Sequence, residues 1–186
     1  MRIGGGRLRG RALASPKSKS IRPTADRLRE SLFDILRHAY SDAISGARVL
    51  DLFAGTGALG IEAVSRGAAF ALFIDDGAEA RALIRENVAA LGLGGVTRLF
   101  RRDATKLGPA HPLEPFALVF LDPPYGQNLA EQALAAAREG GWFSPDALIV
   151  VEEATKSRFA APAGFTELER RAYDDTEFIF VRFNSA

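Results

Sequence analysis

The sequence of 186 residues contains no cysteine and only two histidines, His38 and His111. The absence of cysteine excludes disulfides, thiolate zinc sites and a cysteine nucleophile. The two histidines stand far apart without the spacing of a metal site, so we expect no bound metal. No apolar run approaches the roughly 20 residues that cross a bilayer, which excludes a membrane span. Together these absences predict a cytoplasmic protein that binds neither metal nor membrane.

Hydrophobic residues make up 47% of the chain and charged residues 25%, as in ordinary globular proteins. A chain of this length can bury a substantial core by itself, so we predict one domain over residues 1–186. Within it we distinguish a basic N-terminal extension (residues 1–22), a helical region (23–40) and a core (46–186). We expect a monomer.

The net charge of +1 conceals an asymmetry along the chain. The basic N-terminal extension contains seven of the 24 basic residues and no acidic one, which leaves the rest with 17 against 23, a net charge of −6. This asymmetry predicts that the extension meets a polyanion. It also fits a solvated surface segment or a mitochondrial transit peptide, although Gly4–Gly6 and Gly10 would interrupt the amphipathic helix of the latter. The candidate phosphate-binding residues are Arg7, Arg9, Arg11, Lys17, Lys19 and Arg22.

Strand and helix patterns alternate after the extension. Thr24 is placed to cap a helix whose apolar residues, such as Leu28 and Leu32, recur at helical spacing. Buried strands are predicted at 49–53, 70–74, 96–100, 116–121 and 147–151, with helices through 61–67, 80–91 and 127–139 between them. The stretches 165–172 and 177–183 alternate without an intervening helix, which indicates an antiparallel hairpin through Asp174 and Asp175. The fold class is therefore α/β, with a mostly parallel seven-stranded sheet, an antiparallel C-terminal hairpin and helices on both faces.

Several polar features stand where predicted strands end. In an open parallel sheet these ends meet at one edge, where ligands bind. The stretch 55–60 formally matches the G-x-G-x-x-G loop of NAD-binding proteins. The carboxylate of Asp51 just before this loop instead favours a ligand with a cationic amino group and no pyrophosphate, such as S-adenosylmethionine. The features at these strand ends are Gly55-Thr56-Gly57, Asp75, Asp103 and Asp122.

Residues 51–57, DLFAGTG, resemble the first motif of the class I S-adenosylmethionine-dependent methyltransferases. The resemblance implies a Rossmann-like fold, with Asp75 on the ribose and Asp103-Ala104 on the adenine. The cofactor-binding residues implied in this way are Asp51, Phe53, Ala54, Gly55, Thr56, Gly57, Asp75, Asp103 and Ala104.

Residues 122–125, DPPY, match the D/N-P-P-Y/F motif of methyltransferases that act on planar amino groups. The lone pair of such an amine is delocalised, so acceptors aimed at its N–H bonds are needed to localise it and to stabilise the charge that develops. The Asp122 carboxylate and the Pro123 carbonyl are the two expected acceptors, and Pro124 keeps the backbone rigid. Tyr125 offers a ring on which a base can stack.

The segments 1–11 and 22–33 resemble the opening of the bacterial 16S ribosomal RNA guanine-N2 methyltransferases of the RsmD type, and the resemblance covers essentially the whole chain. Some members have Phe where this chain has Tyr125. The family implies that S-adenosylmethionine is converted to S-adenosylhomocysteine, and that the substrate is 16S rRNA within a small-subunit particle. It also implies that the helical region covers the cofactor and substrate entrance.

DPPY itself does not distinguish guanine N2 from adenine N6, cytosine N4 or a glutamine amide. An amino-methyltransferase for another RNA or DNA base or for a protein glutamine is therefore the alternative. A non-catalytic nucleotide- or RNA-binding module would leave DPPY unexplained. Some polar and aromatic residues have a structural interpretation. Capping and helix-face ion pairs are expected of Thr24, Asp26, Arg27, Arg29 and Glu30, and structural roles of Trp142, Glu152 and Glu153.

Overall fold

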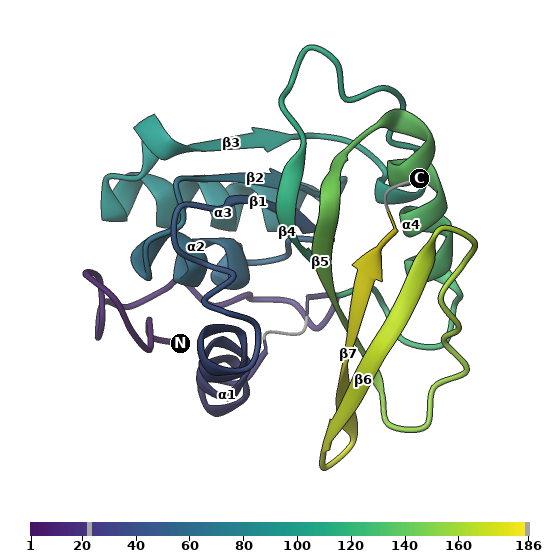
Figure 1. Cartoon of the computed structure of the whole chain (residues 1–186). Helices are drawn as coiled ribbons and strands as arrows, with labels where there is room; N and C mark the ends of the chain where they lie inside the picture. The colour runs from purple at the N-terminus through teal and green to yellow at the C-terminus, as the bar shows by residue number, and fades with distance from the viewer. Residues whose placement is uncertain (22–23, 185–186) are drawn as a thin grey trace.

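A computed structural model describes residues 1–21 and 24–184, which form a seven-stranded sheet (Figure 1). The strand order is β3-β2-β1-β4-β5-β7-β6. Strands β1 to β5 are parallel, and β7 runs antiparallel to both β5 and β6. The predicted sheet and its C-terminal hairpin are therefore confirmed. The strands are β1 (Arg48–Leu52), β2 (Phe70–Ile74), β3 (Thr97–Phe100), β4 (Phe116–Leu121), β5 (Phe143–Ala154), β6 (Phe165–Tyr173) and β7 (Thr176–Phe183).

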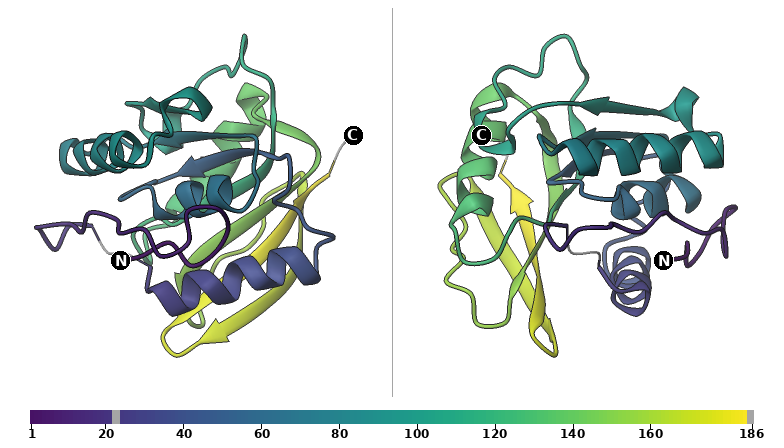
Figure 2. Two further views of the ribbon diagram at one scale, coloured as in Figure 1. Left: turned by 90° about the vertical axis from the view of Figure 1, so that its left-hand side faces the viewer. Right: turned by 180° about the vertical axis from the view of Figure 1, so that it is seen from behind.

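The helices cover both faces of the sheet (Figure 2). Helices α1, α2 and α3 contribute to one apolar cluster, and α4 with the short turn η2 contributes to the other. Successive strand residues alternate between the clusters, so Val49 faces the first and Leu50 the second. The helical segments are α1 (Asp26–His38), α2 (Ala58–Ser65), α3 (Ala78–Leu91), α4 (Leu129–Gly140), and the 3-10 turns η1 (Gly94–Val96) and η2 (Ala104–Lys106).

Strand β1 ends one residue before the predicted end, and strand β5 begins four residues before the predicted start. Strand β1 ends at Leu52 because Phe53 has a φ of 56°, in the left-handed region where a strand cannot continue. Strand β5 begins earlier, at Phe143. The sequence 144–146 contains Pro145 and reads as a turn, but Phe143 pairs with Phe116 of β4 before the register shifts.

The predicted N-cap of the first helix is wrong. Helix α1 begins at Asp26 with Ala25 at the N-cap position, and no side chain caps it. The Thr24 hydroxyl lies instead among carboxylates of the site described below.

The basic N-terminal extension is packed against the body. Ile3, Leu8 and Leu13 are buried in the same cluster as α1 and α2. Its backbone folds back on itself, since Ile3 N donates to Arg11 O and Gly10 N donates to Ile3 O. A Cβ at Gly6 would lie 1.9 Å from the Ser65 carbonyl oxygen, so only glycine allows this approach to α2. The candidate phosphate-binding residues Arg7, Arg9, Arg11, Lys17 and Lys19 are exposed, while Arg22 lies outside the described residues.

Candidate functional site

A cavity of about 630 Å³ opens at the carboxyl ends of the parallel strands. It lies where the chain order reverses between β1 and β4, the place where open α/β sheets bind ligands. The loops after β1, β2 and β4 line it, and so does the end of the basic N-terminal extension. Its lining includes Asp51, Phe53, Ala54, Gly55, Thr56, Asp75, Asp122, Pro123, Pro124 and Tyr125.

The backbone amides of the loop after β1 already donate hydrogen bonds to groups of the protein. Gly55 N donates to Asp75 Oδ2 at 2.9 Å, and Gly57 N donates to the Ala54 carbonyl at 2.8 Å. Ala58 N is 3.3 Å from the Thr56 hydroxyl. A dinucleotide site would need such amides for the pyrophosphate. Their engagement argues against the NAD interpretation of this loop.

Asp51 lies under the loop and is 1% exposed. Its Oδ2 accepts a hydrogen bond from Gly60 N at 3.0 Å. Burial raises the pKa of Asp51 well above its usual range, and the negative charge of Asp75 raises it further. Because burial penalises the ionised form, a cationic group placed in the cavity would stabilise the Asp51 carboxylate.

Asp75 follows β2 and is half-buried. Each of its oxygens accepts one backbone hydrogen bond, Oδ2 from Gly55 N and Oδ1 from Gly77 N, both at 2.9 Å. These bonds fix the carboxylate, and each oxygen retains a second lone pair for ligand hydroxyls. Asp76 and Glu79 also line the cavity, although the sequence motif does not include them.

Three predicted cofactor residues do not line the cavity: Gly57, Asp103 and Ala104. The Asp103 side chain caps η2 by accepting from Thr105 N at 2.9 Å and Thr105 Oγ1 at 2.7 Å. These bonds lower the pKa of Asp103, the hydroxyl contributing most. Ala104 is buried in the second apolar cluster. Their proposed role at the adenine stays a prediction.

The DPPY segment follows β4 directly. Asp122 is half-buried, Pro123 buried and Pro124 exposed. The Tyr125 hydroxyl lies 2.9 Å from Thr176 Oγ1 at the start of β7. This contact ties the tyrosine ring to the edge of the C-terminal hairpin.

Glu152, for which a structural role is expected, lies beside this segment. Leu121 pairs with Val151 in the parallel register, so Asp122 and Glu152 follow as neighbours. Thr24 Oγ1 lies 3.1 Å from Glu152 Oε2 and 3.4 Å from Asp122 Oδ2. A signal was present in the sequence, since each acid closes an apolar run, but it does not reveal the register.

Glu153 is also buried, and its Oε1 lies 3.4 Å from Gly126 N. Burial raises the pKa of Glu153, and the negative charges of Glu131 and Glu177 add to the effect.

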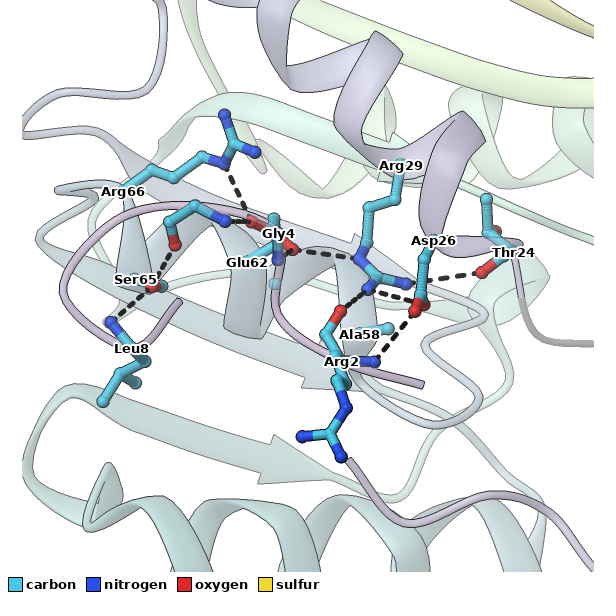
Figure 3. A network of polar contacts seen from close by, with 12 residues as sticks. Arg2, Gly4, Leu8, Thr24, Asp26, Arg29, Ala58, Glu62, Ser65 and Arg66 are labelled. Atoms are coloured by element: carbon cyan, nitrogen blue, oxygen red, sulfur yellow. Dashed lines mark hydrogen bonds and ion pairs between the residues drawn. The ribbon is translucent and has the colours of Figure 1, made fainter. Parts of the chain in front are cut away.

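A buried ion-pair network fixes the extension next to the cavity (Figure 3). The side chains of Arg29 and Glu62 are fully buried, and Arg29 Nε donates to Glu62 Oε1 at 3.0 Å. Glu62 also accepts from Gly4 N and Gly5 N, each at 2.9 Å. The expected helix-face pair of Arg29 is present, since it meets Asp26 Oδ1 at 3.0 Å, but its burial against Glu62 goes beyond that interpretation. Glu62 was not predicted, although a lone acid in the apolar stretch of α2 was its sequence signal.

The end of the extension reaches the mouth of the cavity. Ser20 and Ile21 line it, as does Thr24. Ser18 holds this segment in place, because its backbone N and Oγ donate to Glu79 Oε1 at 3.3 and 3.0 Å. The extension and the first turn of α3 therefore meet at the mouth of the cavity.

Within residues 1–21 and 24–184, no group of three or more His, Cys, Asp or Glu side chains could hold a metal ion. In the same residues no helix is both long and apolar enough to cross a membrane.

The family described as Conserved hypothetical protein 95 matches residues 1–182 of the sequence. The chain belongs to this family. Ribosomal RNA small subunit methyltransferase D of Escherichia coli is 42% identical over 153 residues, covering 82% of this chain and 74% of the relative. Its namesake from Haemophilus influenzae is 35% identical over 175 residues, covering 92% and 88%. The predicted methyltransferase family is confirmed.

Solved structures agree on the fold. The Escherichia coli protein yhhF aligns with a TM-score of 0.84 and 32% identity, covering 100% of this chain and 99% of that one. An RNA methyltransferase from Salinibacter ruber, solved with S-adenosyl-L-homocysteine, aligns with a TM-score of 0.66 over 89% of this chain and 95% of that one. At 13% identity, the second likeness supports the Rossmann-like fold alone.

The residues present fit S-adenosylmethionine. The cavity volume of about 630 Å³ lies within the roughly 300–1,000 Å³ of small-ligand sites. Buried Asp51 suits a cationic amino group, and fixed Asp75 suits ribose hydroxyls. Gly55 has a φ of 59°, in the left-handed region that favours glycine, which lets the loop turn and place its amide against Asp75.

Proposed function

We propose that this chain is an S-adenosylmethionine-dependent methyltransferase that acts on the N2 amine of a guanine in 16S rRNA. Relatives named as small-subunit ribosomal RNA methyltransferases support the substrate class. The observation that carries the reaction is that DPPY lines the same cavity as the loop after β1. We further propose that the protein works as a cytoplasmic monomer on a small-subunit particle.

The donor half of the site lies between β1 and β2. S-adenosylmethionine supplies an electrophilic methyl group when bound. Asp51 faces its amino group, Asp75 holds the ribose hydroxyls, and the backbone of 53–56 with Thr56 forms the floor. Asp103 and Ala104 stay the proposed adenine contacts, and no metal is required because the electrophile is already cationic.

The acceptor half is DPPY. The Asp122 carboxylate and the Pro123 carbonyl accept the two N–H groups of the amine, so its lone pair turns towards the methyl carbon. As the new N–C bond formed and the methyl–sulfur bond broke, leaving neutral S-adenosylhomocysteine, positive charge would grow on nitrogen and Asp122 would stabilise it. The nitrogen then loses a proton, which Asp122 or water accepts. Tyr125 stacks on the base, which must leave its own stack to enter.

The proposal that the substrate is RNA rests on the positive charge of the extension as well as on the family. Exposed cations of the basic N-terminal extension are proposed to contact RNA phosphates, namely Arg7, Arg9, Arg11, Lys17 and Lys19, with Arg22 outside the described residues. Methyl transfer to another base or to a glutamine amide is the competing function, since the amine geometry is shared.

The test is methylation of purified 16S rRNA and of small-subunit particles with isotopically labelled donor, followed by mass analysis of nucleosides. We expect N2-methylguanosine in 16S rRNA. Asp122→Ala should abolish transfer while calorimetry still shows donor binding, and Asp42→Ala, an exposed acid at the end of the α1 region, should act like wild type. Label in another nucleoside or in protein would contradict the substrate assignment. Tight NAD binding without donor binding would contradict the cofactor.

A further inference from the structure

The Thr24 side chain is buried at the boundary between the basic N-terminal extension and α1. It is 7% exposed, and it lines the cavity that Asp51 and Asp122 share. Thr24 lies 98 residues from Asp122 and 128 from Glu152, yet its hydroxyl is within 3.4 Å of the first carboxylate and 3.1 Å of the second. The extension therefore places a hydrogen-bonding group directly against the acceptor half of the site.

Thr24 does not cap the helix that follows it. A Thr preceding α1 would normally cap it, but the cap position is Ala25 and no side chain caps the helix. When a residue does not make the local contact that it favours, here the helix cap, its side chain is expected to serve another contact. The hydroxyl that could have satisfied a helix amide is directed to Asp122 and Glu152 instead.

We propose that Thr24 is a positioning residue for Asp122 in methyl transfer, an inference that rests on the function proposed above. A hydroxyl has one proton and donates to one carboxylate at a time. The shorter contact goes to Glu152, which anchors the hydroxyl beside Asp122. The 3.4 Å approach to Asp122 is long for a hydrogen bond, as catalytic contacts often are before substrate tightens them.

The backbone of Thr24 is fixed as firmly as its hydroxyl (Figure 3). Arg29 Nη1 donates to the Thr24 carbonyl at 3.3 Å, and the Arg29 side chain is held in turn by buried Glu62. The β-branched side chain itself has few rotamers. Thr24 is thus held at its carbonyl by α1 and at its hydroxyl by β5, so it can limit the orientations open to Asp122.

Orientation matters because the acceptor must already point at the amine when charge develops. Misplacement of a reacting group by about 1 Å can cost roughly 100-fold in rate. The inferred role of Thr24 is to act through Asp122 in the acceptor half of the cavity. Its loss should therefore lower kcat and leave the KM for RNA and the affinity for donor nearly unchanged.

The experiment compares Thr24→Val, which removes the hydroxyl and keeps the shape, with Thr24→Ser, which keeps the hydroxyl. On the RNA that wild type methylates, we expect Thr24→Val to lose about 10- to 100-fold in kcat, and Thr24→Ser to recover most of it. Both KM for RNA and Kd for donor should stay nearly unchanged, since a loss confined to the transition state lowers kcat and kcat/KM equally. Thr166→Val, on exposed β6, is the matched control and should behave as wild type.

A second variant weakens the contact that anchors Thr24 and leaves the Thr24 side chain itself in place. Glu152→Gln retains an oxygen for the Thr24 hydroxyl and weakens the anchor, so it should lower kcat less than Thr24→Val, and the two losses should not add. Wild-type kcat in Thr24→Val, loss without rescue by serine, or a change confined to KM would overturn the inference. A wild-type protein that methylates no RNA would instead overturn the proposed function.

Discussion

Tyr125 has two features that separate substitutions can distinguish. Its ring lines the cavity, where the target base would stack, and its hydroxyl contacts Thr176 of β7. The first belongs to substrate binding and the second to the placement of the ring.

We expect Tyr125→Phe to keep stacking but to lose the hydroxyl contact, which costs about 1 kcal/mol of stability and a few-fold in activity. Tyr125→Ala should lose much more activity, since stacking contributes roughly 1–3 kcal/mol. Thr176→Val removes the same hydroxyl contact from the other side and should reproduce Tyr125→Phe. Denaturant unfolding and steady-state kinetics of the three variants measure this.

The comparison of Tyr125→Phe with Thr176→Val is also the control. If Tyr125→Phe lost as much activity as Tyr125→Ala while Thr176→Val stayed active, the hydroxyl itself would act on substrate. Stacking would then be secondary.

At the scale of residues, the sequence predicts best what adjoins the end of a strand. Asp51, Asp75 and DPPY stand beside apolar runs, so their shared edge follows from the sheet. The roles of Thr24 and Glu62 could not be predicted, because their partners are distant in sequence: Asp122 for Thr24, Gly4 and Arg29 for Glu62. Asp103 shows the converse. It follows a strand at the expected edge of the sheet, but its carboxylate accepts a hydrogen bond from its own turn, at Thr105 N.

At the scale of elements, the basic N-terminal extension depends on α2 for its place. Glu62 accepts backbone hydrogen bonds from Gly4 and Gly5 and ion-pairs with Arg29 and Arg66. Net charge gave no indication of this docking, because the buried residues of the extension are aliphatic and its charges point outward.

We predict that Glu62→Ala destabilises the protein by about 3–5 kcal/mol, since it removes the only fully buried carboxylate paired with Arg29 among the described residues and leaves the half-exposed Asp26. For a chain of this size that corresponds to a fall in Tm of roughly 6–20 °C. The released extension should also be cleaved faster by trypsin after Arg7 or Arg9, which calorimetry and limited proteolysis can measure together.

Glu86→Ala, an exposed acid on α3, is the matched control and should change neither Tm nor the cleavage rate. Unchanged protection of the extension in Glu62→Ala would show that Ile3, Leu8 and Leu13 hold it without the ion pairs.

The strand order belongs to the scale of the whole molecule. Periodicity located the strands, and right-handed crossovers limit how they connect, but neither predicts the order β3-β2-β1-β4-β5-β7-β6. The first residues of β5 escaped prediction because Phe143 pairs with Phe116 ahead of a register shift, an irregularity of the kind where a proline such as Pro145 is tolerated. Local patterns thus identify elements, and distant pairing decides where they begin.

The distribution of charge also belongs to the scale of the whole molecule, because it determines which surface contacts the RNA phosphates. The basic N-terminal extension carries seven cations, and the remainder of the chain is net acidic. The body nevertheless has its own exposed cations around α3, β3 and η2, at Arg85, Arg98, Arg101 and Lys106. Two surfaces therefore compete for the role of phosphate contact, and salt dependence separates them.

We predict that the extension supplies most phosphate contacts. If about four of its cations meet phosphates, log affinity should fall against log salt with a slope near −3. Neutralising Arg7, Arg9, Arg11 and Lys17 together should flatten that slope and raise the KM for RNA. Donor affinity should hold, because Ser20 and Ile21 line the cavity and these four residues do not. Neutralising the four body cations is the matched comparison and should leave the slope nearly unchanged. The reverse pattern would place the RNA across α3 and β3, with the extension serving to position Thr24 and to close the donor cavity.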